Sequence, residues 1–170
     1  MDEQRVNEGI SGVFFAIRTG NLGCLRLLRK YGANFNLECM SESKQKMRPI
    51  QYAVYRGTFP IYQFVLECNG ETKENQYNAQ MSNTGSTLLH LNAFKGNTDI
   101  CKDLLKNNMD PFAQNKQGET CLHIAIRRRH VQFIYEIVRW CVSKNITAAQ
   151  AEVESSVEKL TPYMTAVLCE

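Results

Sequence analysis

The stretch that decides the fold is GSTLLHLNAFKGN at residues 85–97, which returns as GETCLHIAIRRRH at residues 118–130. Thr87 and Thr120 occupy the third position of the two stretches, His90 and His123 occupy the sixth, and each pair is 33 positions apart. In both copies a more apolar segment follows, Ile100–Leu105 in the first and Val131–Val138 in the second. A short apolar segment, a break and a second apolar segment predict two helices joined by a turn.

Weaker copies of this pattern lie on either side. Gly20, Gly57, Gly96 and Arg129 occupy the slot between the two helices, at spacings of 37, 39 and 33 residues. The excess over 33 falls between copies, where surface loops tolerate insertions. We predict repeats at about residues 11–36, 48–70, 85–110 and 118–142, with a truncated fifth at 161–170. The whole chain, residues 1–170, is predicted to be a single domain.

Together these residues resemble the ankyrin-repeat family, whose period is about 33 residues. The best-matching pieces are Thr87–His90, Thr120–His123 and Tyr31–Ala33. The resemblance implies an all-α ankyrin-repeat solenoid of helix–turn–helix units with projecting hairpin-like loops, here called fingers. Three fingers are longer than the family minimum, at about residues 35–46, 71–83 and 143–159.

Small side chains and helix caps support this reading. Thr87 and Thr120 are expected to cap the first helix of their repeats, and Pro49 and Pro162 suit a first helical turn. The apolar pattern of the fourth repeat continues past Trp140, which predicts a longer second helix. Alanines that allow close helix packing are assigned to one shared slot of the first helix: Ala16, Ala53, Ala93, Ala125 and Ala166.

Composition places few limits on function. Hydrophobic residues make up 44% of the chain and charged residues 22%, and the net charge of +3 is mildly basic. Seven cysteines without a C-x-x-C pair favour free thiols over disulfides or a zinc site. The sequence shows no secretory signal pattern or membrane-length apolar run. A cytoplasmic or nuclear location in a reducing compartment, without direct membrane insertion, is therefore expected.

No catalytic, cofactor-binding or metal-binding motif is present, so an enzyme is not expected, and no cofactor or metal is assigned. The resemblance places His90 and His123 in a structural slot, where the imidazole ties neighbouring loops together. Cys24, Cys68 and Cys101 lie among apolar helix positions and are interpreted as core side chains.

In proteins that this sequence resembles, the fingers and the positions before each central glycine usually contact a partner. The positions before the glycine slot hold five cationic and two aromatic side chains: Arg18, Thr19, Tyr55, Arg56, Phe94, Lys95, Arg127 and Arg128. If the repeats stack in register, these residues form one concave stripe that favours a protein with an acidic and partly apolar surface or peptide. The finger residues predicted to border it are Met47, Asn83, Thr84, Ser86, Lys116, Gln117 and Glu119. The alternative is a set of ordinary solvated helix ends.

The basic run at residues 127–130 also suggests nucleic acid, but the modest net charge and the missing nucleic-acid motif argue against it. A protein–protein interaction module, an adaptor or scaffold, is the main hypothesis. The alternatives are a regulatory or substrate-recruiting segment of a larger enzyme or ion channel, or an inhibitor of a transcription factor. The fifth repeat stops at Glu170 before its second helix, so we expect the chain to be part of a longer protein. The sequence predicts no oligomeric state.

Overall fold

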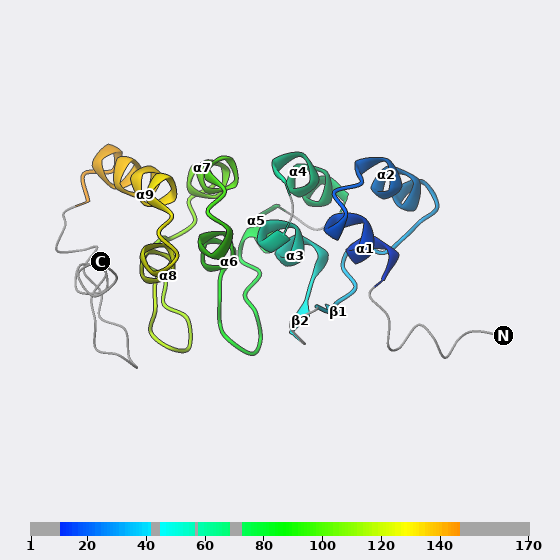
Figure 1. Cartoon of the computed structure of the whole chain (residues 1–170), viewed down its shortest axis with the longest axis horizontal. Helices are drawn as coiled ribbons and strands as arrows, with labels where there is room; N and C mark the ends of the chain where they lie inside the picture. The colour runs from blue at the N-terminus through cyan, green and yellow to red at the C-terminus, as the bar shows by residue number, and fades with distance from the viewer. Residues whose placement is uncertain (1–10, 42–44, 57, 69–72, 147–170) are drawn as a thin grey trace. The chain divides into compact units, whose positions relative to one another are not determined.

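The computed structural model describes residues 11–41, 45–56, 58–68 and 73–146, although not the side chains of residues 73 and 74. The chain forms two compact units that divide between Gln76 and Tyr77. The predicted fifth repeat and most of the third long finger lie outside the described residues. Within each unit, helix–turn–helix repeats lie side by side in two helix layers (Figure 1). The predicted all-α fold of helix–turn–helix units is confirmed.

Unit 1 contains two such repeats. Helices α1 (Gly12–Arg18) and α3 (Pro49–Arg56) form one layer, and α2 (Leu22–Lys30) and α4 (Phe59–Cys68) form the other. The first long finger is a small hairpin in which β1 (Cys39–Met40) pairs antiparallel with β2 (Lys46–Met47). This finger therefore matches its prediction as a hairpin-like loop.

The core of unit 1 is built on stacked aromatic side chains. Phe14 of α1 and Tyr52 of α3 lie with their ring centroids 4.9 Å apart, and both side chains are fully buried. In the second repeat Gln51 occupies the position that histidine holds elsewhere, and its Oε1 accepts a hydrogen bond from the Arg48 backbone N–H at 2.8 Å. A buried amide thus satisfies the start of α3 where the sequence departs from the family pattern.

Unit 2 holds the two copies that define the repeat. Helices α6 (Leu88–Lys95) and α8 (Cys121–Arg127) pack together in one layer, and α7 (Thr98–Lys106) and α9 (Val131–Ser143) pack together in the other. The long loops before α6 and α8 project on the side away from α7 and α9 (Figure 1). A short helix, α5 (Lys73–Tyr77), lies in the second long finger, where unit 1 ends and unit 2 begins. As predicted, α9 is longer than its counterparts.

The turns between paired helices require a left-handed backbone. Gly20 and Gly96 have φ of +69° and +73°, and Arg129 adopts +57° in the equivalent slot of the fourth repeat. Non-glycine residues reach this region at a cost of about 1–2 kcal/mol. The fourth repeat therefore contains local strain that glycine relieves in the first and third repeats.

Two sequence interpretations are wrong in detail. Helix α6 begins directly after its cap Thr87, and α8 begins directly after its cap Thr120. Counted from these caps, the residue of α6 that is equivalent to Ala125 is Asn92, so Ala93 does not share the alanine slot. Asn92 is fully buried; its Nδ2 donates to the Asn97 carbonyl, while its Oδ1 has no hydrogen-bond partner among the residues that the structure describes. Cys24 is exposed rather than a core side chain, because the apolar face of α2 buries only Leu25.

Candidate functional site

Two histidines anchor the fingers of unit 2 to their helices. The Thr87 backbone N–H donates to His90 Nδ1 at 3.2 Å, and the Thr120 N–H donates to His123 Nδ1 at 3.1 Å. Each threonine hydroxyl also lies within 2.9 Å of the same ring nitrogen. Both helices therefore begin with a reciprocal capping arrangement, which satisfies donors that would otherwise have no partner.

His90 also joins one repeat to the next. Because Nδ1 accepts from the Thr87 N–H, the hydrogen of the neutral ring is on Nε2, which donates to the Glu119 carbonyl at 2.8 Å. Burial lowers the pKa of His90, and this effect exceeds the opposing effect of the Glu119 carbonyl. The neutral imidazole thus links the start of α6 to the base of the following finger, as expected for a structural histidine.

Glu119 joins this finger base to the far end of α8. Its side chain is 12% exposed and forms an ion pair with Arg127, whose side chain is 34% exposed. Asn115 Nδ2 donates to the second carboxylate oxygen at 3.4 Å. Arg127 therefore extends back along α8 to the finger, and its charge is compensated within the unit.

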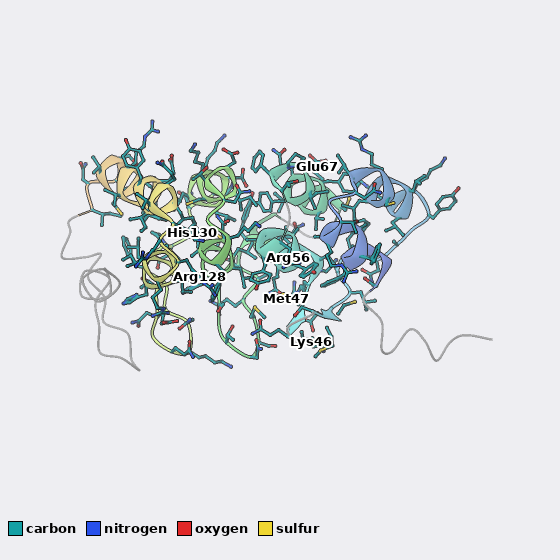
Figure 2. The ribbon with its side chains drawn as sticks, viewed as in Figure 1. Lys46, Met47, Arg56, Glu67, Arg128 and His130 are labelled. Atoms are coloured by element: carbon teal, nitrogen blue, oxygen red, sulfur yellow. The ribbon has the colours of Figure 1, made fainter. Side chains whose placement is uncertain are left out.

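The ends of α6 and α8 meet at an aromatic side chain. The Arg128 guanidinium lies 5.2 Å from the centroid of the Phe94 ring, a cation–π distance. His130 Nε2 lies 3.2 Å from the Phe94 carbonyl oxygen. Figure 2 shows Arg128 and His130 on the side of α8 that faces α6. Phe94 remains 38% exposed, so the ring offers apolar surface beside a cation.

The neighbouring fingers of unit 2 are joined by Lys116. Its backbone N–H donates to the Thr84 carbonyl at 2.8 Å, and its Nζ donates to the Ser82 carbonyl at 2.6 Å. Thr84 also donates from its hydroxyl to Ser86 Oγ at 2.9 Å. Asn83, Lys116 and Gln117 are exposed and Thr84 is half-buried, so these tips present polar groups to solvent.

The structure groups the predicted contact residues of unit 2 but removes some from the surface. Phe94, Lys95, Arg127 and Arg128 lie at the ends of α6 and α8, and all four are exposed. Ser86 and Glu119 are buried, at 5% and 9% exposure, and are left out of the surface proposed below. The Arg127–Glu119 ion pair was missed because Glu119 precedes α8, so helical spacing does not indicate that it meets Arg127.

The predicted residues of unit 1 have a different environment. The Arg18 guanidinium lies 4.8 Å from the Phe15 ring centroid, and the Thr19 hydroxyl donates to the Phe15 carbonyl at 3.0 Å. Tyr55 is half-buried and Arg56 is exposed. Met47 is buried at 1% exposure, and its position on β2 is marked in Figure 2. Met47 therefore belongs to the core of unit 1 and not to its surface.

The buried thiols are poor nucleophiles. Burial raises the pKa of Cys101 to about 12 and raises that of Cys121 well above its usual value. Among the described residues, no group of histidine, cysteine, aspartate or glutamate side chains could hold a metal ion. In the same part of the chain, no helix combines the length and apolar character needed to span a membrane.

Comparisons with known proteins agree with this geometry. A sequence profile described as "Ankyrin repeats (many copies)" matches residues 88–140, from the start of α6 to Trp140. Over 146 residues, 85% of this chain, the sequence is 25% identical to the E3 ubiquitin-protein ligase KEG of Arabidopsis thaliana. The matched region makes up 8% of that protein, so the chain spans a small part of the relative's length.

Proposed function

Because residues 88–140 are ankyrin repeats, we propose that this chain is a protein-interaction module that binds its partner through one surface of unit 2. Ankyrin repeats generally bind proteins. The surface, called here the Phe94 surface, consists of side chains from two helix ends and two finger tips: Phe94, Lys95, Arg128, Asn83, Thr84, Lys116 and Gln117.

The exposed Phe94 ring beneath the Arg128 guanidinium carries the proposal. Aromatic and arginine side chains are enriched at the centres of protein interfaces, where they combine apolar area with charge. Lys95 lies next to Phe94 in sequence and makes no ion pair among the described residues. Arg127 contributes less charge than its sequence position suggested, since Glu119 compensates it.

The partner that fits this surface has an acidic and partly apolar contact region. Lys95 and Arg128 would face carboxylates, while Phe94 would pack against an apolar side chain. An adaptor or scaffold needs no catalytic group at this position, and a non-enzymatic role is part of the proposal. A cytoplasmic or nuclear site of action, and weak or no affinity for nucleic acid, also belong to it.

The test reverses charge on the Phe94 surface. The Lys95→Glu/Arg128→Glu variant is compared with the unchanged chain in affinity capture from cell lysate, followed by titration of each purified partner. The Arg26→Glu/Lys30→Glu variant is the matched control, because it makes the same charge change at exposed positions of α2. We expect a partner that the unchanged chain and the control bind equally, and that the Phe94 surface variant binds about tenfold or more weakly. Equal binding by all three forms would reject this surface.

A second candidate function follows from the partial match to a much longer ligase. Under this alternative, the repeats recruit substrates or regulate a larger enzyme that contains them. An antibody against residues 88–140 should then detect a cellular protein far larger than 19.5 kDa. A cellular product of 19.5 kDa alone would contradict this alternative and leave the free-standing adaptor.

A further inference from the structure

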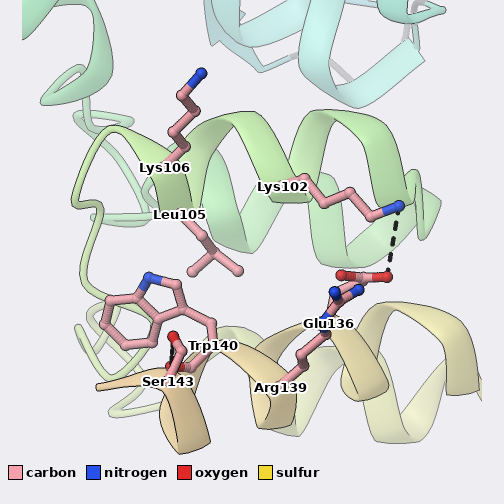
Figure 3. A pocket seen from close by; sticks show the side chains of 7 residues that line it. All are labelled: Lys102, Leu105, Lys106, Glu136, Arg139, Trp140 and Ser143. Carbon is pink, nitrogen blue, oxygen red and sulfur yellow. Dashed lines mark hydrogen bonds and ion pairs between the residues drawn. The ribbon is translucent and has the colours of Figure 1, made fainter.

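A groove lies between α7 and α9, in the helix layer of unit 2 on the side away from the fingers (Figure 3). Its volume is about 220 Å³. Side chains from both helices line it: Lys102, Leu105, Lys106, Glu136, Arg139, Trp140 and Ser143. This volume is below the range of about 300–1,000 Å³ that is usual for small-molecule sites. It suits one inserted side chain rather than a cofactor.

The floor of the groove is apolar. Leu105 is 3% exposed and its side chain points toward the indole ring of Trp140 in Figure 3. Trp140 is half-buried, so part of the indole remains accessible. A half-buried tryptophan beside a buried leucine offers an apolar contact of the kind that anchors interface side chains.

Most of the charges around this floor are positive. Lys102 is already paired, because its Nζ lies 3.5 Å from Glu136 and 4.0 Å from Asp99. In contrast, Lys106 and Arg139 make no ion pair among the described residues. Lys144 adds a further cation, with its Nζ 6.0 Å from the centroid of the Trp140 ring.

The charge balance therefore favours an acidic ligand. Glu136 is the one acidic side chain that lines the groove among the described residues, and Lys102 compensates it. Lys106 from α7 and Arg139 from α9 also line the groove, and neither forms an ion pair with another residue that the structure describes. Carboxylates on either side of a central apolar side chain match this arrangement, since the apolar group meets Trp140 and the carboxylates meet these two cations.

We propose that the α7–α9 groove binds an acidic peptide segment of a partner protein, with one apolar side chain inserted against Trp140 and Leu105. This site is separate from the Phe94 surface, since it is built from the other pair of helices. The chain would then hold two protein segments at once, one on each helix layer of unit 2. The proposal does not depend on the Phe94 surface being correct.

The test uses the fluorescence of Trp140, the single tryptophan of the chain. The probes are synthetic peptides with glutamates on both sides of a central leucine, phenylalanine, alanine or lysine. We expect the leucine and phenylalanine peptides to shift the Trp140 emission saturably. The alanine peptide should bind about tenfold or more weakly, because it fills less of the groove. The lysine peptide should not bind.

Two variants assign the binding to the groove. The Lys106→Glu/Arg139→Glu variant keeps Trp140 and should lose at least about tenfold in affinity for the leucine peptide. The Arg26→Glu/Lys30→Glu variant carries the same charge change at exposed positions of α2 and should bind this peptide as the unchanged chain does. Circular dichroism of both variants should match that of the unchanged chain, which confirms that both are folded.

Several outcomes would overturn the proposal. These are no saturable signal with any acidic peptide, equal affinity of the leucine and alanine peptides, or no effect of the Lys106→Glu/Arg139→Glu change. Vesicles that contain phosphatidylserine provide the last comparison. If they shift the Trp140 emission while the peptides do not, the groove belongs to a membrane-facing surface, and a peptide site is excluded.

Discussion

The close approach of Gly96 to His130 gives the sharpest test of how adjacent repeats pack. A Cβ added at Gly96 would lie 2.6 Å from two atoms of the His130 ring and 3.0 Å from a third, and the backbone there has φ +73°. A Gly96→Ala substitution therefore meets two separate penalties. The left-handed backbone costs about 1–2 kcal/mol for a residue with a Cβ. Displacing His130 costs about a further 1 kcal/mol, through an off-rotamer side chain or the lost contact with the Phe94 carbonyl.

The expected loss in the free energy of unfolding is the sum, about 2–3 kcal/mol. Urea unfolding followed by Trp140 fluorescence measures it, since Trp140 lies in the same unit as Gly96. The His130→Ala background separates the two penalties. In that background the clash is absent, and Gly96→Ala should cost about 1–2 kcal/mol.

Gly20→Ala is the control for the backbone penalty alone, with φ +69° and no atom within 4 Å of the added Cβ. Its cost, measured by circular dichroism, should match the smaller value. If Gly96→Ala destabilises the chain equally with and without His130, the ring is not the obstacle and the reasoning fails.

Four further predictions concern the histidine link, its pH dependence, the thiols and the strained turn. His90→Leu should destabilise unit 2 by about 2–4 kcal/mol in urea unfolding, because it leaves the Thr87 N–H and the Glu119 carbonyl without their partner. His90→Gln should lower the free energy of unfolding less, since Gln51 accepts the equivalent N–H in unit 1. Equal losses for the two variants would contradict this explanation. Burial lowers the pKa of His90 in the folded chain below its ordinary 6.5, so as the pH falls the unfolded chain binds this proton before the folded chain does. The contribution of neutral His90 to stability is therefore complete above pH 6.5 and is lost as the pH falls toward the lowered pKa. In unfolding curves between pH 7 and 5, the unchanged chain should lose free energy of unfolding more steeply than the His90→Gln variant. In the native chain, the exposed Cys24 should react rapidly with a disulfide reagent, whereas the buried Cys101 and Cys121 should react only on unfolding. The Cys24→Ser variant should therefore lose a fast phase of the reaction that the Cys101→Ser variant keeps. Arg129→Gly should raise the free energy of unfolding by about 0.5–1 kcal/mol by relieving a left-handed arginine, and a destabilised variant would show that the Arg129 side chain contributes more than the strain costs.

The repeat architecture was predictable because its determinants are local. Thr87, His90 and Gly96 each satisfy a requirement of one helix end: a cap, a capping partner and a left-handed residue. Such requirements recur at fixed spacing and are visible in a single sequence. The long α9 was predictable for the same reason, since its apolar pattern continues through Trp140.

The details of the candidate surface were less predictable because they depend on which side chains meet. Arg127 looked like one of a row of free cations, yet it pairs with Glu119, which the sequence placed on a finger. Met47 and Ser86 also seemed exposed on fingers, but Met47 of β2 is 1% exposed and Ser86 is 5% exposed. The Ala93 error has another cause: an alanine one position away concealed that a buried asparagine, Asn92, fills the shared slot. Tertiary contacts determine these outcomes, and the spacing of residues in the chain does not reveal them.

The bonds from Lys116 to Thr84 and Ser82 have a consequence for the speed of recognition. Both finger tips of unit 2 are held in place by groups of the protein itself before any partner arrives. A partner that lands on them need not wait for a loop to order, and little conformational entropy is lost on contact. Association should therefore be governed by diffusion and by the charges of Lys95 and Arg128, and affinity differences among partners should appear mainly in how slowly they leave.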